Sequence, residues 1–291
     1  MEAFSTTADP SYQDSSLGDI LRRTKGLSSD QVAQALEYQQ AKGVRFGEAI
    51  VALGLARHDD IIWALSQQFH YPYSPVAERE LNDELVVANQ PFSDNVERFR
   101  ELRSQLILSS LSDTENRRAL AIVSADKGEG KTFIASNLAV AFSQLPGRTL
   151  LIDADMRTAR LHKVFGVDAS HGLSGILAGR NEANVIKPVS YLPNLYLLPA
   201  GVQSPNPAEL LHRAAFSLLL RELLSKFDYV LVDTPAAVHG ADARIIASHC
   251  GAAMVVGRQG SSKVDHMQKL VKQLTSSQVK IAGVLVNEHQ S

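Results

Sequence analysis

The sequence has almost no cysteine, no excess of charge of either sign and no long apolar run. Cys250 is the only cysteine among 291 residues, which excludes a disulfide framework and any metal site built from several cysteines. No stretch approaches the roughly 18 apolar residues needed to span a bilayer. The acidic, polar start of the chain is unlike a signal peptide. These absences predict a cytoplasmic protein without a membrane span of its own.

The charge balance excludes further classes. Lys and Arg number 29 against 31 Asp and Glu, a net charge of −2, so nothing indicates binding to nucleic acid or to a membrane surface. With 45% hydrophobic and 21% charged residues, the composition is that of a folded globular protein and excludes disorder as the dominant state. The length predicts two domains.

The N-terminal region contains a tandem repeat. Residues 1–14 lack periodicity and are expected to form a flexible tail. Over residues 15–70 the pattern is helical and repeats with a period of 29, so that Leu17-Gly18 matches Phe46-Gly47. We expect two copies of a short-helix, turn, longer-helix unit, packed together because each is too small to bury its apolar face alone. Residues 71–93 contain proline, lack a period and are expected to form a linker.

Residues 94–291 alternate between expected helices and continuous apolar runs. A helix is expected to begin at Ser93 or Asp94. Runs without polar alternation suit strands that are buried on both faces of a parallel sheet, with helices between them. The pattern predicts an α/β fold with a mostly parallel sheet flanked by helices, beside a small all-α N-terminal domain. The expected strands are 119–124, 149–153, 195–199, 229–233, 253–257 and 281–287.

A glycine-rich turn follows the first expected strand. The order strand, Gly128-Glu129-Gly130-Lys131-Thr132, helix is that of a P-loop, in which main-chain N–H groups and a lysine bind nucleotide phosphates and a hydroxyl binds Mg²⁺. The strict pattern has glycine where this chain has Ala125, so the loop is a variant. The expected nucleotide-binding residues are Lys127, Gly128, Glu129, Gly130, Lys131, Thr132 and Phe133.

Carboxylates follow two further strands. Asp153 and Asp155 come at the end of the second, and Asp233 at the end of a later one. Ligands of open α/β sheets bind beyond the carboxyl ends of the strands, so these residues are expected to lie beside the P-loop. In phosphoryl transfer such carboxylates hold Mg²⁺ or accept the proton of the nucleophile. Each alone could equally cap the next helix; three of them beside a P-loop favour the catalytic interpretation.

Together these motifs resemble those of the bacterial tyrosine kinases. Asp-x-Asp-x-Arg ends at Arg157 and Asp-x-Pro ends at Pro235, while Pro205 begins a further family element, Pro-Asn-Pro-Ala-Glu-Leu-Leu. The upstream motif Glu97-x-x-Arg100-x-x-Arg103 is similar to the family's self-association motif. Without the family, it would equally suit a solvated helix face with charges three residues apart. The resemblance is greatest to the chain-length-determinant kinases of exopolysaccharide clusters and covers residues 94–291.

The resemblance implies roles for these residues. Lys131, Asp153 and Asp155 would be catalytic, with Asp153 activating the tyrosine hydroxyl. Thr132, Asp155 and Asp233 would hold Mg²⁺. The cofactors would be ATP and Mg²⁺, the substrate a protein tyrosine, and the protein a homo-oligomer. The expected partner is the cytoplasmic tail of an inner-membrane chain-length regulator, which would recruit the protein to that membrane.

The sequence departs from the family pattern at several points. Lys127 stands where many members have proline, and Ala236 replaces a second proline. No tyrosine follows Tyr229, which puts self-phosphorylation at a C-terminal cluster in doubt. The alternative function is that of a switch ATPase of the partition or positioning class. Its signature lysine, five residues before the P-loop lysine, falls on Asp126, which favours the kinase.

The N-terminal repeat resembles the N-terminal domains of type II secretion and pilus ATPases, some of which bind cyclic di-GMP. The second copy begins Arg45-Phe46-Gly47, as in the nucleotide-binding version, but the first has Ser16 in place of the arginine. Arg45 and Gly47 are therefore candidates for a second-messenger site, where an arginine plane can stack on a purine. The alternative is a small helical docking module whose glycines and leucines only build its core.

Overall fold

A computed structural model describes residues 15–68, 82–91, 93–113, 117–180, 182–192 and 194–288. The predicted tail, residues 1–14, and about half of the predicted linker, residues 71–81 and 92, lie outside the described residues. The chain divides into two compact units between Arg79 and Glu80, with the short segment Ser190–Pro193 grouped with the first. The predicted limits near residues 70 and 94 stay a prediction.

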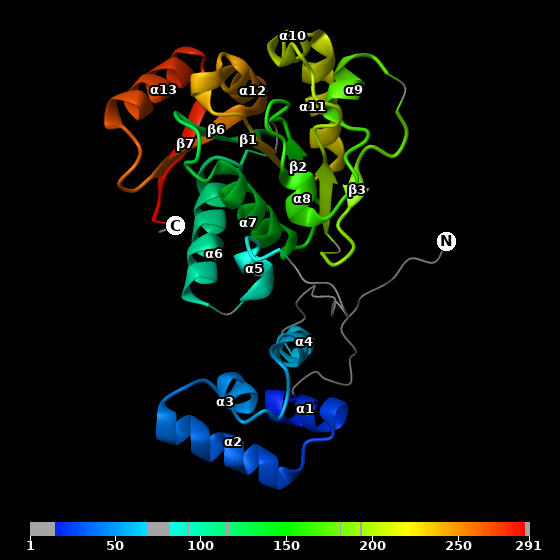
Figure 1. Ribbon diagram of the computed structural model, residues 1–291, viewed down its shortest axis with the longest axis vertical. Helices are drawn as coiled ribbons and strands as arrows, with labels where there is room; N and C mark the ends of the chain where they lie inside the picture. Colours follow the sequence, from blue (N-terminus) through cyan, green and yellow to red (C-terminus); the bar gives the residue numbers. More distant parts are fainter. Residues whose placement is uncertain are drawn as a thin grey trace. The chain divides into compact units, whose positions relative to one another are not determined.

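The first unit contains four helices in its described residues. Their starts follow the predicted period: Leu17 and Phe46 begin α1 and α3, 29 residues apart, and Ser29 and His58 begin α2 and α4, again 29 apart. Helix α1 packs against α4 and α2 against α3, as Figure 1 shows. The bounds are α1 Leu17–Lys25, α2 Ser29–Lys42, α3 Phe46–Ala52 and α4 His58–Gln68.

Local sequence signals account for these helices. The hydroxyls of Ser16 and Ser28 accept hydrogen bonds from the third N–H of α1 and α2, and Gly26 and Gly43 end both helices in the left-handed conformation. The apolar positions that recur every three or four residues meet in one small core, and Trp63 packs against its edge. The fully buried members of that core are Ile20, Leu21, Ala35, Ala49, Ile50 and Ala64.

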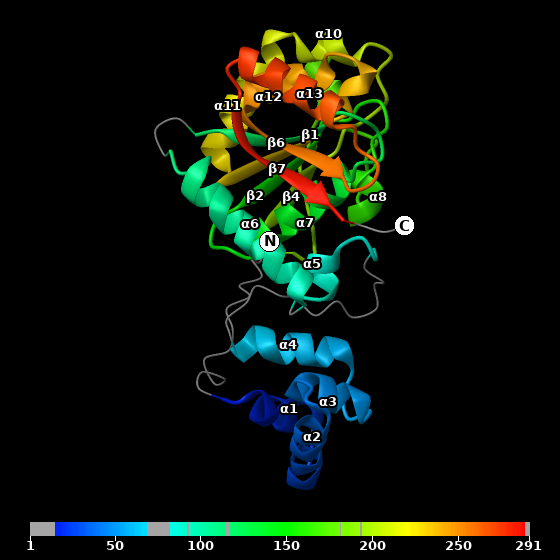
Figure 2. The same ribbon diagram turned by 90° about the vertical axis from the view of Figure 1, so that its left-hand side faces the viewer.

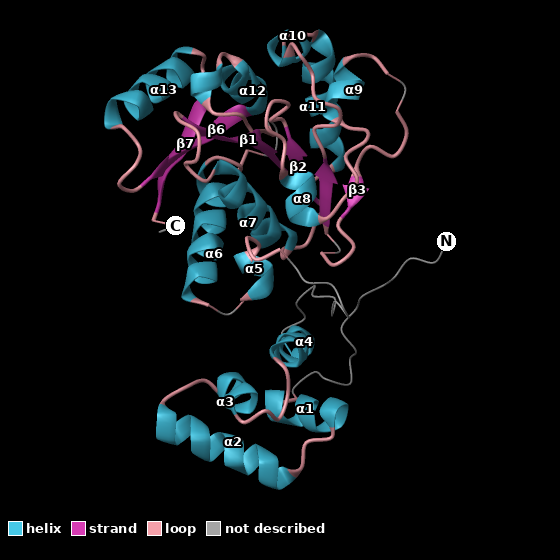
Figure 3. Cartoon of the chain, viewed as in Figure 1, coloured by secondary structure: helices cyan, strands magenta, loops and turns pink. Residues whose placement is uncertain are grey.

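The second unit is built on a seven-stranded sheet in the order β3-β4-β2-β5-β1-β6-β7. All neighbouring strands are parallel except β3 and β4, which are antiparallel. The fold prediction is confirmed: the sheet is mostly parallel, and its apolar strands are buried because helices cover both faces (Figure 3). The strands are β1 Ala119–Ser124, β2 Thr149–Asp153, β3 Lys187–Pro188, β4 Leu195–Leu198, β5 Tyr229–Asp233, β6 Gly251–Arg258 and β7 Lys280–Asn287.

Helices cover the sheet in two groups. Helix α7 crosses one face and contacts the central strands, with α5, α6 and α8 against it, while α9 to α13 lie over the other face, as Figures 1 and 2 show. The main core lies between the sheet and this second group, around Phe216 and Leu220. The bounds are α5 Val86–Asn89, α6 Asp94–Ser109, α7 Lys131–Ser143, α8 Leu161–Phe165, α9 Leu173–Leu177, α10 Pro207–Leu211, α11 Ala214–Lys226, α12 Asp242–Cys250 and α13 Val264–Ser276.

Residues 82–91, which fall within the predicted linker, pack against the rest of the second unit. Leu85 and Val87 are fully buried, and the Val87 N–H donates to the Asn137 side chain on α7, 3.0 Å away. The Asn137 amide in turn donates to the Glu84 carbonyl at 2.7 Å. Asn137, 50 residues further along the chain than Val87, holds this segment in place. Local periodicity in the sequence does not predict such a contact.

Residues 207–226 form two helices, α10 and α11, and not one continuous helix. Arg213 takes an extended conformation between α10 and α11, and its guanidinium donates to the Leu177 carbonyl at 3.1 Å.

None of the helices within the described residues combines the length and apolar character needed to cross a bilayer.

Candidate active site

The phosphate-binding loop, residues 125–130, joins the end of β1 to the start of α7. Gly128 and Gly130 have φ of +81° and +94°, a left-handed conformation that favours glycine. Gly130 is the N-cap of α7, so the free N–H groups of the first helical turn, with their partial positive charge, face the loop. The structure thus has the strand, loop and helix that the sequence predicts for a phosphate site.

Lys131 is held within the site. Only 8% of the residue is exposed, and its amino group donates to the Ser124 hydroxyl at the end of β1, 2.9 Å away. Burial lowers the pKa of the Lys131 amino group, while Asp233, Asp155 and Glu129 act in the opposite direction through their negative charges. The three carboxylates are therefore close enough to stabilise the charged amine.

Asp233 has one oxygen without a partner. The Thr132 hydroxyl donates to Asp233 Oδ2 at 2.7 Å, but Oδ1 is buried and accepts no hydrogen bond. Burial raises the pKa of Asp233 to about 6, against the opposing effects of the Thr132 hydroxyl and the Lys131 charge. A buried acceptor that lacks a donor is costly unless a ligand completes it. This atom and the adjacent hydroxyl suit a hard cation such as Mg²⁺.

The described residues contain no group of three or more His, Cys, Asp or Glu that could hold a metal ion by itself.

Asp153 lies directly beside Asp233, as the register of β2 and β5 pairs them. It is fully buried, and its two oxygens accept from main-chain N–H groups: Oδ1 from Asp155 at 3.2 Å and Oδ2 from Leu161 at 3.1 Å. Burial raises the pKa of Asp153 well above its ordinary value, and the negative charges of Asp233 and Asp155 act in the same direction. The residue predicted as the base thus has a raised pKa, and its carboxylate is buried within the protein.

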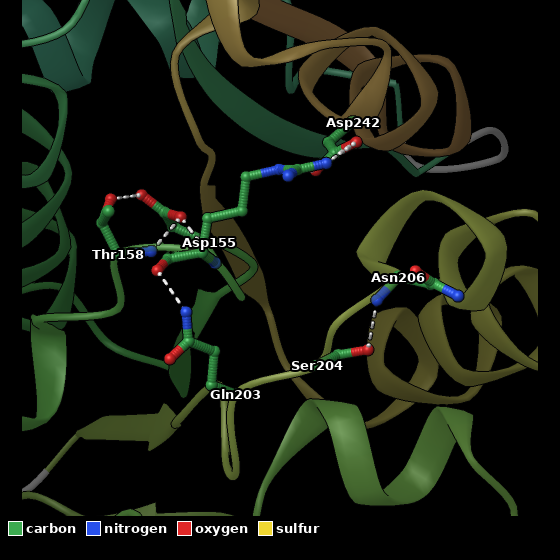
Figure 4. Close-up of polar contacts among 7 residues, drawn as sticks. Asp155, Thr158, Gln203, Ser204, Asn206 and Asp242 are labelled. Carbon is green, nitrogen blue, oxygen red and sulfur yellow. Dashed lines mark hydrogen bonds and ion pairs between the residues drawn. The ribbon is translucent and has the colours of Figure 1, made fainter.

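Asp155 closes the turn after β2. Its Oδ1 accepts from the N–H groups of Arg157 and Thr158 at 3.0 and 2.8 Å, and its Oδ2 accepts from the Thr158 hydroxyl at 2.7 Å (Figure 4). Oδ1 is therefore fully used within the turn, whereas Oδ2 accepts one hydrogen bond and keeps a lone pair for a metal ion or a water molecule.

Arg157 is paired with a carboxylate that sequence reasoning missed. Its Nε donates to Asp242 Oδ2 at 2.7 Å and one terminal nitrogen to Oδ1 at 3.3 Å (Figure 4). Asp242 is only 2% exposed and begins α12, 85 residues after Arg157. The amide of Gln203, after β4, donates to the Arg157 carbonyl at 3.2 Å. The signal in the sequence was faint, since an aspartate at a helix start is common.

We predict that Asp242→Ala lowers the free energy of unfolding by about 2 kcal/mol, since it leaves a half-buried guanidinium without its bidentate partner. Asp265→Ala is the matched control, because Asp265 is exposed and also lies in the first turn of a helix, α13. Urea unfolding followed by circular dichroism measures both. Equal losses in the two variants would mean that only the helix terminus matters and not the pair with Arg157.

The remaining phosphate-loop residues differ in placement. Lys127 and Gly128 are exposed and remain candidates for contact with a nucleotide. The Phe133 ring packs edge-on against Phe99 of α6, with centroids 6.2 Å apart. The Glu129 side chain, by contrast, is only 1% exposed and bonds within the protein. Its carboxylate therefore does not face a ligand.

The Glu97, Arg100 and Arg103 motif lies on α6. Glu97 and Arg100 form an ion pair, and Arg100 also donates to the Pro91 carbonyl at 2.6 Å. Arg103 donates to the Ala141 carbonyl of α7 at 2.6 Å. Both arginines thus fasten α6 to its own unit, and Glu97 is the more exposed side of the ion pair. Their role in self-association stays a prediction.

In the first unit, Arg45 is the N-cap of α3 and its N–H donates to the Glu48 carboxylate at 2.9 Å. Gly47 lies against Ile61, whose Cγ2 would be 2.7 Å from an added Cβ. This close approach of α3 and α4 explains the glycine by packing alone. A role of Arg45 and Gly47 toward cyclic di-GMP stays a prediction from resemblance.

Comparison with known proteins adds to this geometry. A family model described as the CobQ/CobB/MinD/ParA nucleotide binding domain matches residues 120–291. The tyrosine-protein kinase wzc of Salmonella typhimurium is 33% identical over 210 residues, which make up 72% of this chain and 29% of that protein. The chain therefore spans less than a third of the length of this curated relative.

Two solved structures bear on the choice between functions. The kinase domain of Escherichia coli tyrosine kinase ETK is 31% identical with a TM-score of 0.67, covering 74% of this chain and 85% of that domain. The septum site-determining protein MinD of Pyrococcus horikoshii, solved with Mg-ADP, is 27% identical with a TM-score of 0.52, covering 59% of this chain and 70% of that one. By identity, coverage and superposition, the chain is more similar to the kinase domain.

Proposed function

Because the chain belongs to the bacterial tyrosine kinases within the CobQ/CobB/MinD/ParA nucleotide-binding family, we propose that it transfers the γ-phosphoryl group of ATP to a protein tyrosine. One observation carries the proposal. The amine of Lys131, the Thr132–Asp233 pair and the buried Asp153 lie together at the carboxyl edge of the central strands. Phosphoryl transfer needs this combination of cation, metal-binding oxygens and carboxylate base.

The nucleotide phosphates would lie against the loop and the N–H groups at the start of α7, with Lys131 turning from Ser124 to the β- and γ-phosphates. Thr132 and the orphan Oδ1 of Asp233 would hold Mg²⁺, with Asp155 contributing through water. When bound, Mg²⁺ neutralises charge on the phosphates. The residues fit this group because a buried oxygen that no protein donor satisfies adjoins a hydroxyl.

Asp153 would accept the proton of the tyrosine hydroxyl. Its raised pKa makes it a stronger base than an ordinary aspartate, and its position beside Asp233 places it near the metal site. Since its carboxylate is covered and bonded to the Asp155 and Leu161 N–H groups, we infer that the turn of residues 154–160 opens when substrate binds.

The partner and the location follow from the resemblance to the exopolysaccharide branch of these kinases. We propose that the chain works in the cytoplasm, beside an inner-membrane chain-length regulator whose cytoplasmic tail completes the site and recruits the kinase to the membrane. Self-association through α6, around the exposed side of Glu97, is part of the same proposal. Nothing in the residues of the site itself concerns polysaccharide chemistry.

The second candidate function is that of a switch ATPase, which the similarity to MinD favours. Against it, Asp126 stands where that class has its signature lysine, and Asp126 instead bonds to His266 at 2.8 Å. Because residue 126 is an aspartate, no basic side chain at that position can reach across to a second subunit.

The deciding experiment incubates the purified chain with Mg²⁺ and ATP, with and without the cytoplasmic tail of the regulator. Phosphotyrosine and free phosphate are measured together. We expect phosphotyrosine on the tail or on the chain, formed at a higher rate when the tail is present. Release of phosphate with no phosphotyrosine on any component would replace the kinase with the switch ATPase.

A further inference from the structure

Glu129 presents a conflict of charge within the phosphate-binding loop. It is a carboxylate flanked by the two glycines of a loop that has to bind phosphates, and a carboxylate facing them would repel them. The structure avoids this by burial: the residue is 1% exposed. Its Oε2 accepts from the N–H of Asp126 at 2.8 Å, which folds the side chain back along the loop.

The other oxygen is held by a residue from a distant part of the chain. Ser262, in the segment between β6 and α13, donates its hydroxyl proton to Glu129 Oε1. The Ser262 hydroxyl is the donor because a carboxylate oxygen only accepts, and the Ser262 oxygen itself accepts from the Arg258 N–H at 2.6 Å. A defined donor thus reaches the loop across 133 residues of sequence.

Two further contacts join the same parts. The Asn287 amide, at the end of β7, donates to the Glu129 carbonyl at 3.3 Å. The same amide lies where a Cβ on Gly130 would be, with Nδ2 2.2 Å from that point, so the loop and the end of β7 are in close contact. His266 of α13 bonds to Asp126 at 2.8 Å. The segment after β6 and the end of β7 therefore support the phosphate-binding loop from one side.

We propose that Ser262 is a positioning residue for nucleotide binding, which holds the Glu129 carboxylate away from the phosphates and keeps the loop in its binding shape. A buried carboxylate that loses one of its two donors becomes less stable in its pocket, since a hydrogen bond to a charged group contributes more than one between neutral groups. Without the Ser262 hydroxyl, the Glu129 side chain can leave its pocket, and its carboxylate can then approach phosphates bound to the loop. The proposal rests on the proposed function only in that the ligand is Mg-ATP.

The test measures the affinity of the full chain for Mg-ATP by isothermal titration calorimetry. We expect Ser262→Ala to weaken binding by about tenfold, in keeping with the loss of one charged hydrogen bond. Ser262→Thr keeps the hydroxyl and should bind as the wild type does. Ser261→Ala is the matched control, because Ser261 is exposed and only its main-chain N–H is bonded, to the Arg258 carbonyl at 3.1 Å.

A second pair of variants separates positioning from general destabilisation. With Glu129→Ala as background there is no carboxylate to hold, so adding Ser262→Ala should change the affinity less than twofold. The same loss in both backgrounds, or wild-type affinity in Ser262→Ala, overturns the proposal. A chain that binds Mg-ATP with the expected pattern but forms no phosphotyrosine contradicts the proposed kinase and leaves the role of Ser262 supported. Absence of Mg-ATP binding by the wild type overturns both.

Discussion

Lys131→Met is expected to abolish phosphotransfer and to weaken Mg-ATP binding by at least about a hundredfold. The reason is that the lysine amine is proposed to contact the phosphates both in the bound nucleotide and in the transition state. Lys131 is the buried cation of the site; it bonds to Ser124, and the negative charges of nearby carboxylates act on its amino group. Methionine keeps most of the length and the apolar stem of the side chain but removes the positive charge that opposes these carboxylates where a polyanion has to bind. Calorimetry with Mg-ATP and phosphotyrosine detection measure the two effects.

The control for this prediction is Lys163→Met, which makes the same change on an exposed lysine of α8. It should leave both binding and transfer within about twofold of the wild type, in line with ordinary surface substitutions. Circular dichroism on both variants checks that the fold persists. If Lys131→Met keeps ATP turnover and phosphotyrosine formation at wild-type rates, the assignment of the phosphate site is wrong.

Asp153→Asn is expected to separate binding from chemistry. As the proposed base, Asp153 should contribute about 10²–10⁴-fold to transfer, so the variant should lose that much in kcat while its Mg-ATP affinity changes only a few-fold. Asparagine retains one acceptor oxygen, which can serve one of the two main-chain donors, Asp155 or Leu161. Steady-state transfer rates and calorimetry on the same preparation measure the two quantities.

The pH profile gives an independent readout. A base works only when deprotonated, and the pKa of Asp153 is raised well above its ordinary value. Transfer by the wild type should therefore fall as the pH drops through that raised pKa, well above the range of an ordinary aspartate. The residual activity of Asp153→Asn should fall less steeply on the acidic side, because only Asp233, with its pKa raised to about 6, then titrates there, whereas Asp168→Asn, a change at an exposed aspartate, should keep the wild-type profile. Parallel loss of nucleotide affinity and transfer in Asp153→Asn would instead make Asp153 structural or a metal ligand.

The phosphate site could be predicted from local pattern because each of its signals is short-range. A continuous apolar run marks a buried strand, glycines at Gly128 and Gly130 mark a turn with positive φ, and an aspartate after a run marks a strand end. Parallel strands carry their ends to one edge of the sheet, so the meeting of Lys131, Asp153 and Asp233 follows from the fold class. The 29-residue repeat likewise appears in the starts of α1 to α4.

Short-range pattern was therefore enough for the class of fold, for the position of the candidate phosphate site and for the carboxylates proposed to act beside it. The tertiary structure alone decided which polar groups oppose one another. It pairs Arg157 with Asp242, turns Glu129 to Ser262, fastens Arg103 to α7 and packs residues 82–91 onto that helix. These partners are 38 to 133 residues apart. A buried polar side chain needs a hydrogen-bond partner, and that partner is whichever polar group the packed chain brings next to it. Periodicity along the sequence does not predict which group that is.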